Sequence, residues 1–494
     1  MTGPERRQRP ESVLTLARHW ASRKRREVAT YHPPRRFGRT FLANLVAFSE
    51  RLGRRMRTVG IDVPSLAQVP NRRMAIGAAW MLGANGIQLL AQAAYYLILA
   101  RRLGAEGYGA FVGALAIVSL VGPFAAMGAG NLLVQGLSRG VDSPRVLWSR
   151  AVATAAHWGA GLSLVTVTLG WFAMRGRISF ELLVGLAVSD LLLLPLIQVS
   201  GQAFQGLERL NRTAQVYVVW SVLKVAAAAM LTLVPGAGLR LWTILYPLST
   251  GICALLAVLA VSRELGWPRK AAVFTRGELR EGLLFSVGDS ARSVYNDIDK
   301  AMLARLGSLG ATGVYGAAYR MIDIAFAPVR SLLAATYPRF FSRGKTGVDA
   351  TSSLARRLLP LAGVYSLVAG AAVYMVAPLV PLVLGQTYVE VVPALRWLAI
   401  LPLLRSIHYF AADALTGAGH QGWRTTTQVA VALLNVGLNL VLIPAYSWAG
   451  AAWASIFSDG VLAVALWIIL STLAHRALGN GAAPPPRATI VAEP

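Results

Sequence analysis

Twelve apolar segments, each long enough to cross a lipid bilayer as a helix, follow one another along this chain of 494 residues. A bilayer core about 30 Å thick requires roughly 20 apolar residues in a helix. Hydrophobic residues make up 55% of the chain and charged residues only 14%, which excludes a single soluble core. We predict an all-α polytopic membrane protein with about 12 transmembrane helices. The segments lie near 76–99, 110–134, 151–174, 179–201, 214–235, 241–262, 283–306, 312–338, 358–383, 391–415, 425–445 and 448–473.

A charged break after the sixth segment divides the chain into two six-helix bundles. The expected parts are a basic extension at 1–73, an N-terminal bundle at 74–262, a linker at 263–282, a C-terminal bundle at 283–476 and a tail at 477–494. The extension holds 17 Lys and Arg against 5 Asp and Glu, and its amphipathic stretch around Phe41–Met56 suits a membrane surface. We expect it to be partly interfacial and partly disordered, unless translation starts at Met56 or Met74. The Pro-rich tail is expected to be disordered.

The basic residues of the loops indicate an orientation. With the N-terminus inside, six Lys and Arg fall in outside loops and 18 in inside loops and the tail, without counting the extension. Because basic loops stay in the cytoplasm, both termini are predicted to be cytoplasmic. The same distribution assigns the net charge of +26 to membrane contacts rather than to nucleic acid.

The two halves of the sequence repeat one another. The stretch LARRLGAEGYGAF from Leu99 matches LARLGSLGATGVYGAA from Leu303, with Tyr108-Gly109 opposite Tyr315-Gly316. Six helices separate the copies, and an even number gives both halves the same orientation. The sequence therefore predicts two bundles related by internal pseudo-symmetry, facing each other across a central cavity.

The seventh segment is unusual because it carries charges at membrane depth. On a helix at about 100° per residue, its polar side chains share one face. Ionised groups inside a membrane turn toward water or a partner, so this face is predicted to line a translocation path. The polar residues are Asp289, Arg292, Ser293, Asn296, Asp297, Asp299 and Lys300.

The first segment has a neutral polar face. Asn85, Gln88, Gln92 and Tyr96 follow helical spacing, so the first bundle is expected to line the path with hydrogen-bonding groups. These side chains could equally be polar contacts between tightly packed helices.

Several stretches in order carry a family resemblance: ILARRLGAEGYGAF, NDIDKAMLARLGSLGATGVYGAAYRMID, APLVPLVLGQTYVEVVPALRWLAI, ALTGAGHQ and LNVGLNLVLIPAYSWAGAAWAS. Over about residues 72–475 the chain resembles the polysaccharide-transporter branch of the multidrug/oligosaccharidyl-lipid/polysaccharide exporter superfamily. The resemblance implies two six-helix bundles in a V and alternating access. It also implies flipping of an undecaprenyl-pyrophosphate-linked oligosaccharide across the bacterial plasma membrane for O-antigen, capsule or exopolysaccharide assembly.

A lipid-linked sugar pyrophosphate needs fixed positive charge and hydrogen-bonding groups along its path, and Arg matches phosphate through its fork of donors. The candidate substrate-binding residues are Arg292, Asn296, Lys300, Arg320, Gln88 and Gln92. The carboxylates Asp289, Asp297, Asp299 and Asp323 are candidates for charge pairing or for binding a coupling proton or Na⁺. A purely structural ion-pair network is the alternative.

Other polar residues at membrane depth receive no site role: Asp190, Lys224, Arg396, His408 and Asp459. Arg405 and Asp413 are expected near helix ends, with their side chains snorkelling to the interface.

Motifs for catalysis are missing from the sequence. Gly344-Lys345-Thr346 superficially matches a phosphate-binding loop, but Arg339 stands where its first glycine belongs. The sequence has neither His-Glu-x-x-His nor Gly-x-Ser-x-Gly, and its one cysteine, Cys253, forms no metal motif. We expect no enzyme activity, no cofactor and no metal.

Three alternatives to an oligosaccharide flippase remain open. A lipid II flippase resembles an architecture with two further C-terminal helices, and a drug or cation antiporter requires an acidic cavity. A scaffold without transport activity would recruit a glycosyltransferase or glycan polymerase through the basic extension. These enzymes, membrane lipids and the lipid-linked oligosaccharide are the expected partners, and nucleic acid is not.

Overall fold

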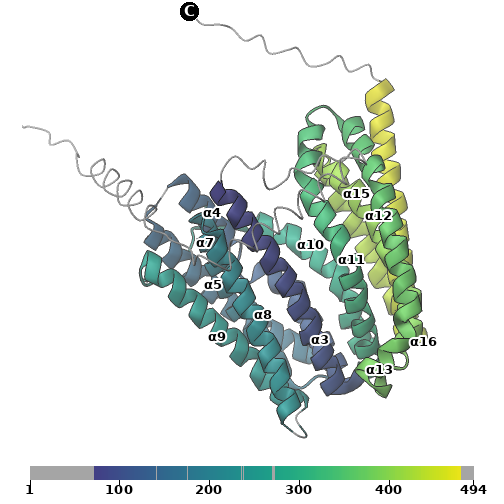
Figure 1. The fold of residues 1–494 in the computed structure, drawn as a ribbon, viewed down its shortest axis with the longest axis horizontal. Helices are drawn as coiled ribbons and strands as arrows, with labels where there is room; N and C mark the ends of the chain where they lie inside the picture. Colours follow the sequence, from purple (N-terminus) through teal and green to yellow (C-terminus); the bar gives the residue numbers. More distant parts are fainter. Residues whose placement is uncertain are drawn as a thin grey trace, which may run out of the picture. The chain divides into compact units, whose positions relative to one another are not determined.

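A computed structural model describes residues 72–140, 142–174, 176–234, 236, 238–269 and 273–479. These residues are almost all helical and contain no β-strand (Figure 1). Nearly all of the predicted basic extension, and the tail after Gly479, lie outside the described residues. From Ala84 onward the chain forms one compact unit, and the packing below belongs to that unit.

The N-terminal half contains six membrane-length helical segments, two of them assembled from shorter pieces. The first helix, α3, is broken at Gly104, whose φ of 66° and ψ of 176° are available to glycine but strained for other residues. The elements are α3 (Arg72–Val121), η2 (Gly122–Phe124), α4 (Ala129–Arg139), α5 (Pro144–Met174), α6 (Phe180–Ala187), the π-helical turn η3 (Val188–Leu193), α7 (Leu194–Gly206), α8 (Leu210–Leu233) and α9 (Leu239–Leu265).

The C-terminal half repeats this plan. Its last helix, α16, is broken at Ser447, a non-glycine residue with φ 54° and ψ −131°. The elements are α10 (Arg276–Leu306), α11 (Leu309–Gly344), α12 (Val348–Val376), η4 (Ala377–Leu379), α13 (Val380–Leu384), η5 (Gln386–Tyr388), α14 (Val391–Leu398), α15 (Leu401–Gly417) and α16 (Gln421–Gly479).

Among the described residues, seven helices are long and apolar enough to cross a membrane, or eight with the bent pair Gln386–Leu398 and Leu401–Gly417. Two of the seven, Gly83–Arg139 and Gln421–Ala477, have 57 residues each and contain the breaks at Gly104 and Ser447. Each is therefore two crossings. The charged helices α10 and α11 supply the remaining segments, which confirms the prediction of about twelve.

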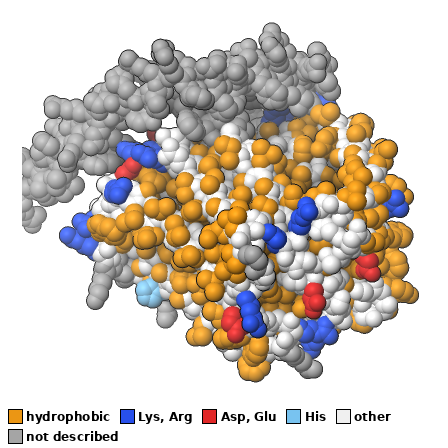
Figure 2. All heavy atoms as spheres, turned by 60° about the horizontal axis from the view of Figure 1, so that its bottom comes forward, with side chains coloured by type: hydrophobic (Ala, Val, Ile, Leu, Met, Phe, Trp, Pro, Cys, Tyr) orange, Lys and Arg blue, Asp and Glu red, His pale blue; other side chains and the backbone are white. Residues whose placement is uncertain are grey.

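The surface of the helices is apolar, as a lipid environment requires. Exposed hydrophobic side chains include Phe172, Leu233 and Met375, each at least 74% exposed. Figure 2 shows hydrophobic side chains over much of one face, with few charges among them. Apolar surface of this extent is characteristic of a membrane protein rather than of a soluble monomer.

The helices pack into two bundles. In the N-terminal bundle α7 contacts α4, α5, α8 and α9, and in the C-terminal bundle α15 contacts α11, α12 and α16. Helix α10 touches both, because it packs on η2 and α4 of the first bundle and on α11 and α16 of the second.

The repeated segments predicted from sequence meet each other in the structure. A Cβ atom at Gly109 on α3 would lie 1.7 Å from the Leu309 carbonyl oxygen, and one at Gly313 on α11 would lie 1.9 Å from that of Ala105. Only glycine at both positions allows the two backbones to approach this closely. Tyr108 and Tyr315, the paired tyrosines of the repeat, are both buried in the adjoining core.

The seventh helix begins earlier than predicted. It starts at Arg276 rather than near residue 283, because Thr275 and Glu278 form a capping box at its N-terminus. Glu278 also pairs with Arg150 on α5 at 2.5 Å. Burial alone would raise the pKa of Glu278, but hydrogen bonds from Thr275 and Arg150 hold it below its usual value.

Candidate functional site

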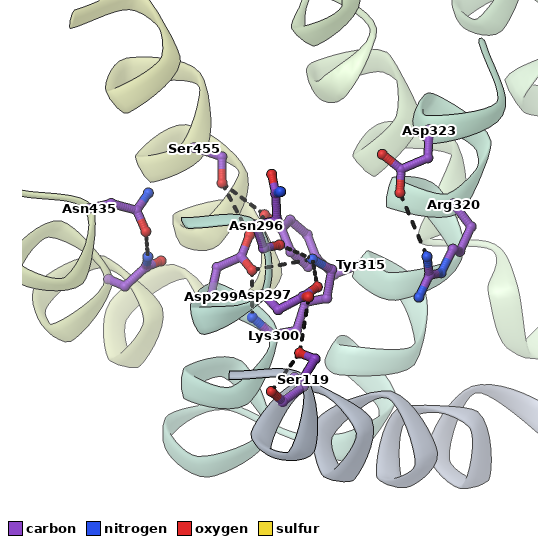
Figure 3. A network of polar contacts seen from close by, with 12 residues as sticks. Ser119, Asn296, Asp297, Asp299, Lys300, Tyr315, Arg320, Asp323, Asn435 and Ser455 are labelled. Atoms are coloured by element: carbon purple, nitrogen blue, oxygen red, sulfur yellow. Dashed lines mark hydrogen bonds and ion pairs between the residues drawn. The ribbon is translucent and has the colours of Figure 1, made fainter. Parts of the chain in front are cut away.

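The last turns of α10 contain a buried cluster of charged side chains (Figure 3). Lys300 Nζ lies 3.0 Å from Asp297 Oδ1 and 3.5 Å from Asp299 Oδ1, and it also donates to the backbone carbonyl of Asn296. Its ammonium group sits 4.4 Å from the ring centre of Tyr319 on α11. Lys300 is only 6% exposed, so its charge is satisfied by the protein itself.

Asp299 connects α10 to two other helices of the C-terminal bundle. Its Oδ2 accepts hydrogen bonds from Tyr315 on α11 at 2.5 Å and from Ser455 on α16 at 3.3 Å. The two hydroxyl groups are themselves 2.9 Å apart. Asp299 is 2% exposed, and these donors offset the cost of burying its carboxylate.

Asp297 reaches in the opposite direction, toward the first bundle. Its Oδ2 accepts a hydrogen bond of 3.0 Å from Ser119 on α3. Its other oxygen holds Lys300, and its side chain is 28% exposed. The two carboxylates around Lys300 therefore face different bundles, one across the junction and one into the C-terminal core.

Arg320 on α11 also lies where the bundles meet. Its guanidinium carbon is 4.3 Å from the ring centre of Tyr96 on α3, and its side chain is 30% exposed. Its carboxylate contact is long, at 3.8 Å to Asp323 Oδ2. The other oxygen of Asp323 is held by Arg405 at 3.1 Å. Arg320 is therefore oriented by an aromatic ring while part of its donor fork stays accessible.

The prediction that Arg405 snorkels to the membrane interface is wrong. Instead, this residue is 7% exposed inside the C-terminal bundle. Besides Asp323, it contacts Asp459 on α16 at 3.6 Å, and His408 lies 3.6 Å from the same carboxylate. Asp413, expected to snorkel as well, is buried and lies 3.4 Å from Arg424. Oppositely charged side chains elsewhere in the fold compensate both charges inside the bundle. A single sequence does not show which side chains will meet in this way.

The remaining candidates from sequence fall in two groups. Gln92 on α3 is exposed and Gln88 is partly exposed, on the same helix as Tyr96. Asn296 takes part through its carbonyl oxygen. The side chains of Asp289 and Arg292 lie outside those that the structure describes, although α10 runs through both positions.

A second polar cluster, in the N-terminal bundle, received no role from the sequence. Tyr246 on α9 donates a hydrogen bond of 2.8 Å to Asp190 Oδ1 in the π-helical turn η3. The tyrosine oxygen in turn accepts from Lys224 Nζ on α8 at 3.4 Å. Trp220, one helical turn before Lys224, lies beneath its ammonium group at 4.7 Å. An aromatic residue four positions before a lysine in an apolar helix was the sequence pattern that could have indicated this cluster.

Taken together, the C-terminal network joins the basic groups of Lys300, Arg320 and Arg405 to the carboxylates of Asp297, Asp299, Asp323 and Asp459. Lys300 and Arg405 are buried against carboxylates, whereas Arg320 keeps an accessible face. The described residues contain no group of His, Cys, Asp and Glu suited to a metal ion. The site can hold ions and polar groups at membrane depth.

Structural comparison places the chain among membrane transporters in fold. An inward-facing multidrug resistance MATE family transporter of the MOP superfamily matches with a TM-score of 0.67 and 17% identity, covering 80% of this chain and 96% of that one. An outward-facing MATE transporter of that superfamily gives 0.53, with 16% identity and coverage of 81% and 96%. A MOP transporter from Pyrococcus furiosus, described as having a binding pocket of reverse polarity that suggests a different function, gives 0.55 at 15% identity, covering 80% and 94%.

Sequence comparison adds the family. No protein with a curated description matches the chain. The family model for polysaccharide biosynthesis proteins matches residues 75–343, which is more than half of the chain. This confirms the resemblance seen in the sequence, and the chain belongs to the polysaccharide biosynthesis protein family.

Proposed function

We propose that this protein is a flippase that carries an undecaprenyl-pyrophosphate-linked oligosaccharide from the inner to the outer leaflet of the bacterial plasma membrane. The substrate has an anionic pyrophosphate, a hydroxyl-rich glycan and an apolar tail. Its head would cross between the two bundles while the tail remains in lipid. Glycosyltransferases on the cytoplasmic side and a polymerase on the far side are the partners this function implies.

Arg320 is the observation that carries the proposal. Phosphate binds best to a planar guanidinium presented in a fixed orientation. Tyr96 holds the guanidinium from the first bundle, and Asp323 leaves it partly uncompensated at 3.8 Å. A bound pyrophosphate would therefore gain charge-assisted hydrogen bonds at the junction without first breaking a close ion pair.

The packing supports alternating access. The contact of Gly109 with Leu309 and of Gly313 with Ala105 closes the bundles at the ends of helices that are predicted to face outward. The higher TM-score to the inward-facing transporter agrees with this state. We infer that this contact opens when the cargo leaves, while the charged network of α10 and α11 exchanges partners.

A drug or cation antiporter is the second candidate, because four carboxylates share three basic groups in the C-terminal network. This small acidic excess would attract a cation. However, Lys300 and Arg405 already occupy those carboxylates, and a soluble cation would have to displace them. Of the three basic groups, Arg320 is the accessible one, with its side chain 30% exposed, and it would be the group that receives an anionic cargo.

The experiment measures flipping of an NBD-labelled undecaprenyl pyrophosphate carrying one N-acetylglucosamine, in vesicles containing the purified full-length chain. Arg320→Ala should abolish flipping, and Arg320→Lys should restore only part of it, because an ammonium group lacks the donor fork. Arg330→Ala is the matched control, since this exposed arginine on the same helix has one hydrogen-bond partner among the described residues, the backbone carbonyl of Asp323. Wild-type rates in Arg320→Ala would refute the role of Arg320, and transport of an organic cation in place of the lipid would favour the antiporter.

A further inference from the structure

The polar cluster of the N-terminal bundle is a chain of three hydrogen-bonded groups, the relay, whose two end members are partly exposed. Lys224 Nζ donates to the oxygen of Tyr246 at 3.4 Å, and the Tyr246 hydroxyl donates to Asp190 Oδ1 at 2.8 Å. Lys224 and Asp190 are both partly exposed, whereas Tyr246 between them is 3% exposed. None of the carboxylates with described side chains lies within ion-pair distance of Lys224. The acid and the base therefore communicate through one buried hydroxyl.

The surroundings hold the lysine in place without neutralising it. Its ammonium group lies 4.7–4.9 Å from the ring centres of Trp220, Tyr246 and Tyr95. Aromatic faces attract a cation but offer no proton acceptor of their own. The hydroxyl of Tyr95 has no hydrogen-bond partner among the described residues, so Tyr246 is the ring that also provides a route for a proton.

Asp190 and Tyr246 both lie next to irregularities in the helical backbone. Asp190 lies in the π-helical turn Val188–Leu193, an element that often marks functional positions. Pro195 follows this turn and lacks the N–H that would continue the regular helix. Tyr246 directly precedes Pro247, which lies inside α9 and also lacks a backbone N–H. Each proline removes one helix hydrogen bond, and each lies close to a residue of the relay.

The relay is linked to the cargo site through adjacent tyrosines. Tyr95, beside Lys224, has its ring centre 4.7 Å from that of Tyr96, and Tyr96 lies under the guanidinium of Arg320. The titratable and charged groups around Lys224 are thus Tyr246 and Asp190 within the bundle, Tyr95 and Tyr96 on α3, and Arg320 on α11. Of these, Asp190 is the only carboxylate.

We propose that Asp190, Tyr246 and Lys224 form a proton-exchange site that couples transport to the proton gradient. The step moves one proton from Lys224 to the Tyr246 oxygen while the Tyr246 proton passes to Asp190. An N–H and an O–H bond break, two O–H bonds form, and the ammonium and carboxylate groups become a neutral amine and a neutral carboxylic acid. Either end then exchanges a proton with water. The anionic cargo at Arg320 favours the charged lysine, and its departure favours the neutral pair.

The coupling role rests on the proposed flippase function, so two measurements separate them. The first needs no cargo: infrared difference spectra of the purified full-length chain in nanodiscs between low and neutral pH. Wild type should show the C=O band of a protonated carboxyl group that Asp190→Asn lacks, and Lys224→Met should shift the midpoint pH of this band. A band that is the same in wild type and Asp190→Asn would overturn the exchange site, whether or not the protein flips lipid.

The second measurement compares flipping of the NBD-labelled lipid with and without a pH gradient. Wild type should flip faster with the gradient, and in Tyr246→Phe this ratio of rates should fall to one, because the ring remains but the hydroxyl is gone. Tyr95→Phe is the matched comparison and should keep the wild-type ratio. Equal loss in both variants, or retention in Tyr246→Phe, would overturn the relay. Failure of the wild type to flip the lipid would instead count against the proposed function.

Discussion

Replacing Gly109 by alanine should open the contact between the two bundles. The added Cβ would lie 1.7 Å from the Leu309 carbonyl oxygen and 2.7 Å from the Gly313 nitrogen, both of which are backbone atoms that no side-chain rotation can move. The first distance is half of the 3.4 Å at which ordinary contact begins. The helices α3 and α11 must therefore separate at this crossing.

The cost falls on the closed state alone. Overpacking a tight contact costs about 1–3 kcal/mol. If the crossing is absent from the outward-open state, that state is favoured by the same free energy. The equilibrium constant between the two states then changes roughly 5- to 150-fold. Glycine at position 310 provides the control, because a Cβ there meets nothing within 4 Å.

Cysteine labelling measures this shift. Ala311 is buried at a cavity of about 530 Å³ formed by the connections between helices, and Cys253 is the one native cysteine. In a Cys253→Ala background, a membrane-impermeant maleimide added outside should label Ala311→Cys faster when Gly109→Ala is present. Gly310→Ala should leave the rate unchanged. Equal labelling with and without Gly109→Ala, in protein that is folded by its melting temperature, would refute the idea that this crossing is a gate.

Three further outcomes are expected. Lys300→Met leaves Asp297 and Asp299 without their cation and should lower stability by about 3–5 kcal/mol, seen as a lower melting temperature, whereas a small change would mean that the cluster is hydrated. Because its folded pKa is depressed, Glu278 contributes stability above its unfolded pKa and loses it as pH falls through the folded value. Melting temperatures of wild type and Glu278→Gln should therefore converge at low pH, and a constant gap would contradict this. Deleting residues 1–70 should preserve flipping in vesicles, whereas complete loss would support the scaffold alternative.

The sequence predicted the membrane crossings but not every residue at which a helix begins. Apolar length predicted the segments because lipid imposes that length on a helix. The start of α10 at Arg276 was missed because four of the seven residues before the apolar run are charged, and the Thr275–Glu278 capping box stabilises a helix there. The predicted segment limits at 99 and 110 and at 445 and 448 bracketed the two breaks, and the backbone angles locate them at Gly104 and Ser447.

Part of the candidate site could also be predicted from the sequence. Helical spacing placed Asp297 and Lys300 on one face, and the structure shows them 3.0 Å apart. The spacing could not show that Asp299 and Lys300 are buried, since this depends on Tyr315 and Ser455 from two other helices. Lys224 received no role from the sequence for the same reason, since the tyrosines around it come from α3 and α9, which are far apart in the chain.

The most direct test of the flippase account compares two labelled lipids with the same undecaprenyl tail and the same N-acetylglucosamine. One carries the pyrophosphate, and in the other a neutral linker replaces it. In vesicles containing the purified wild-type protein, the pyrophosphate lipid should move between leaflets. The neutral lipid should change leaflets no faster than it does in protein-free vesicles. Equal movement of both lipids, or movement of neither, would contradict the claim that a cationic junction between the bundles recognises this cargo.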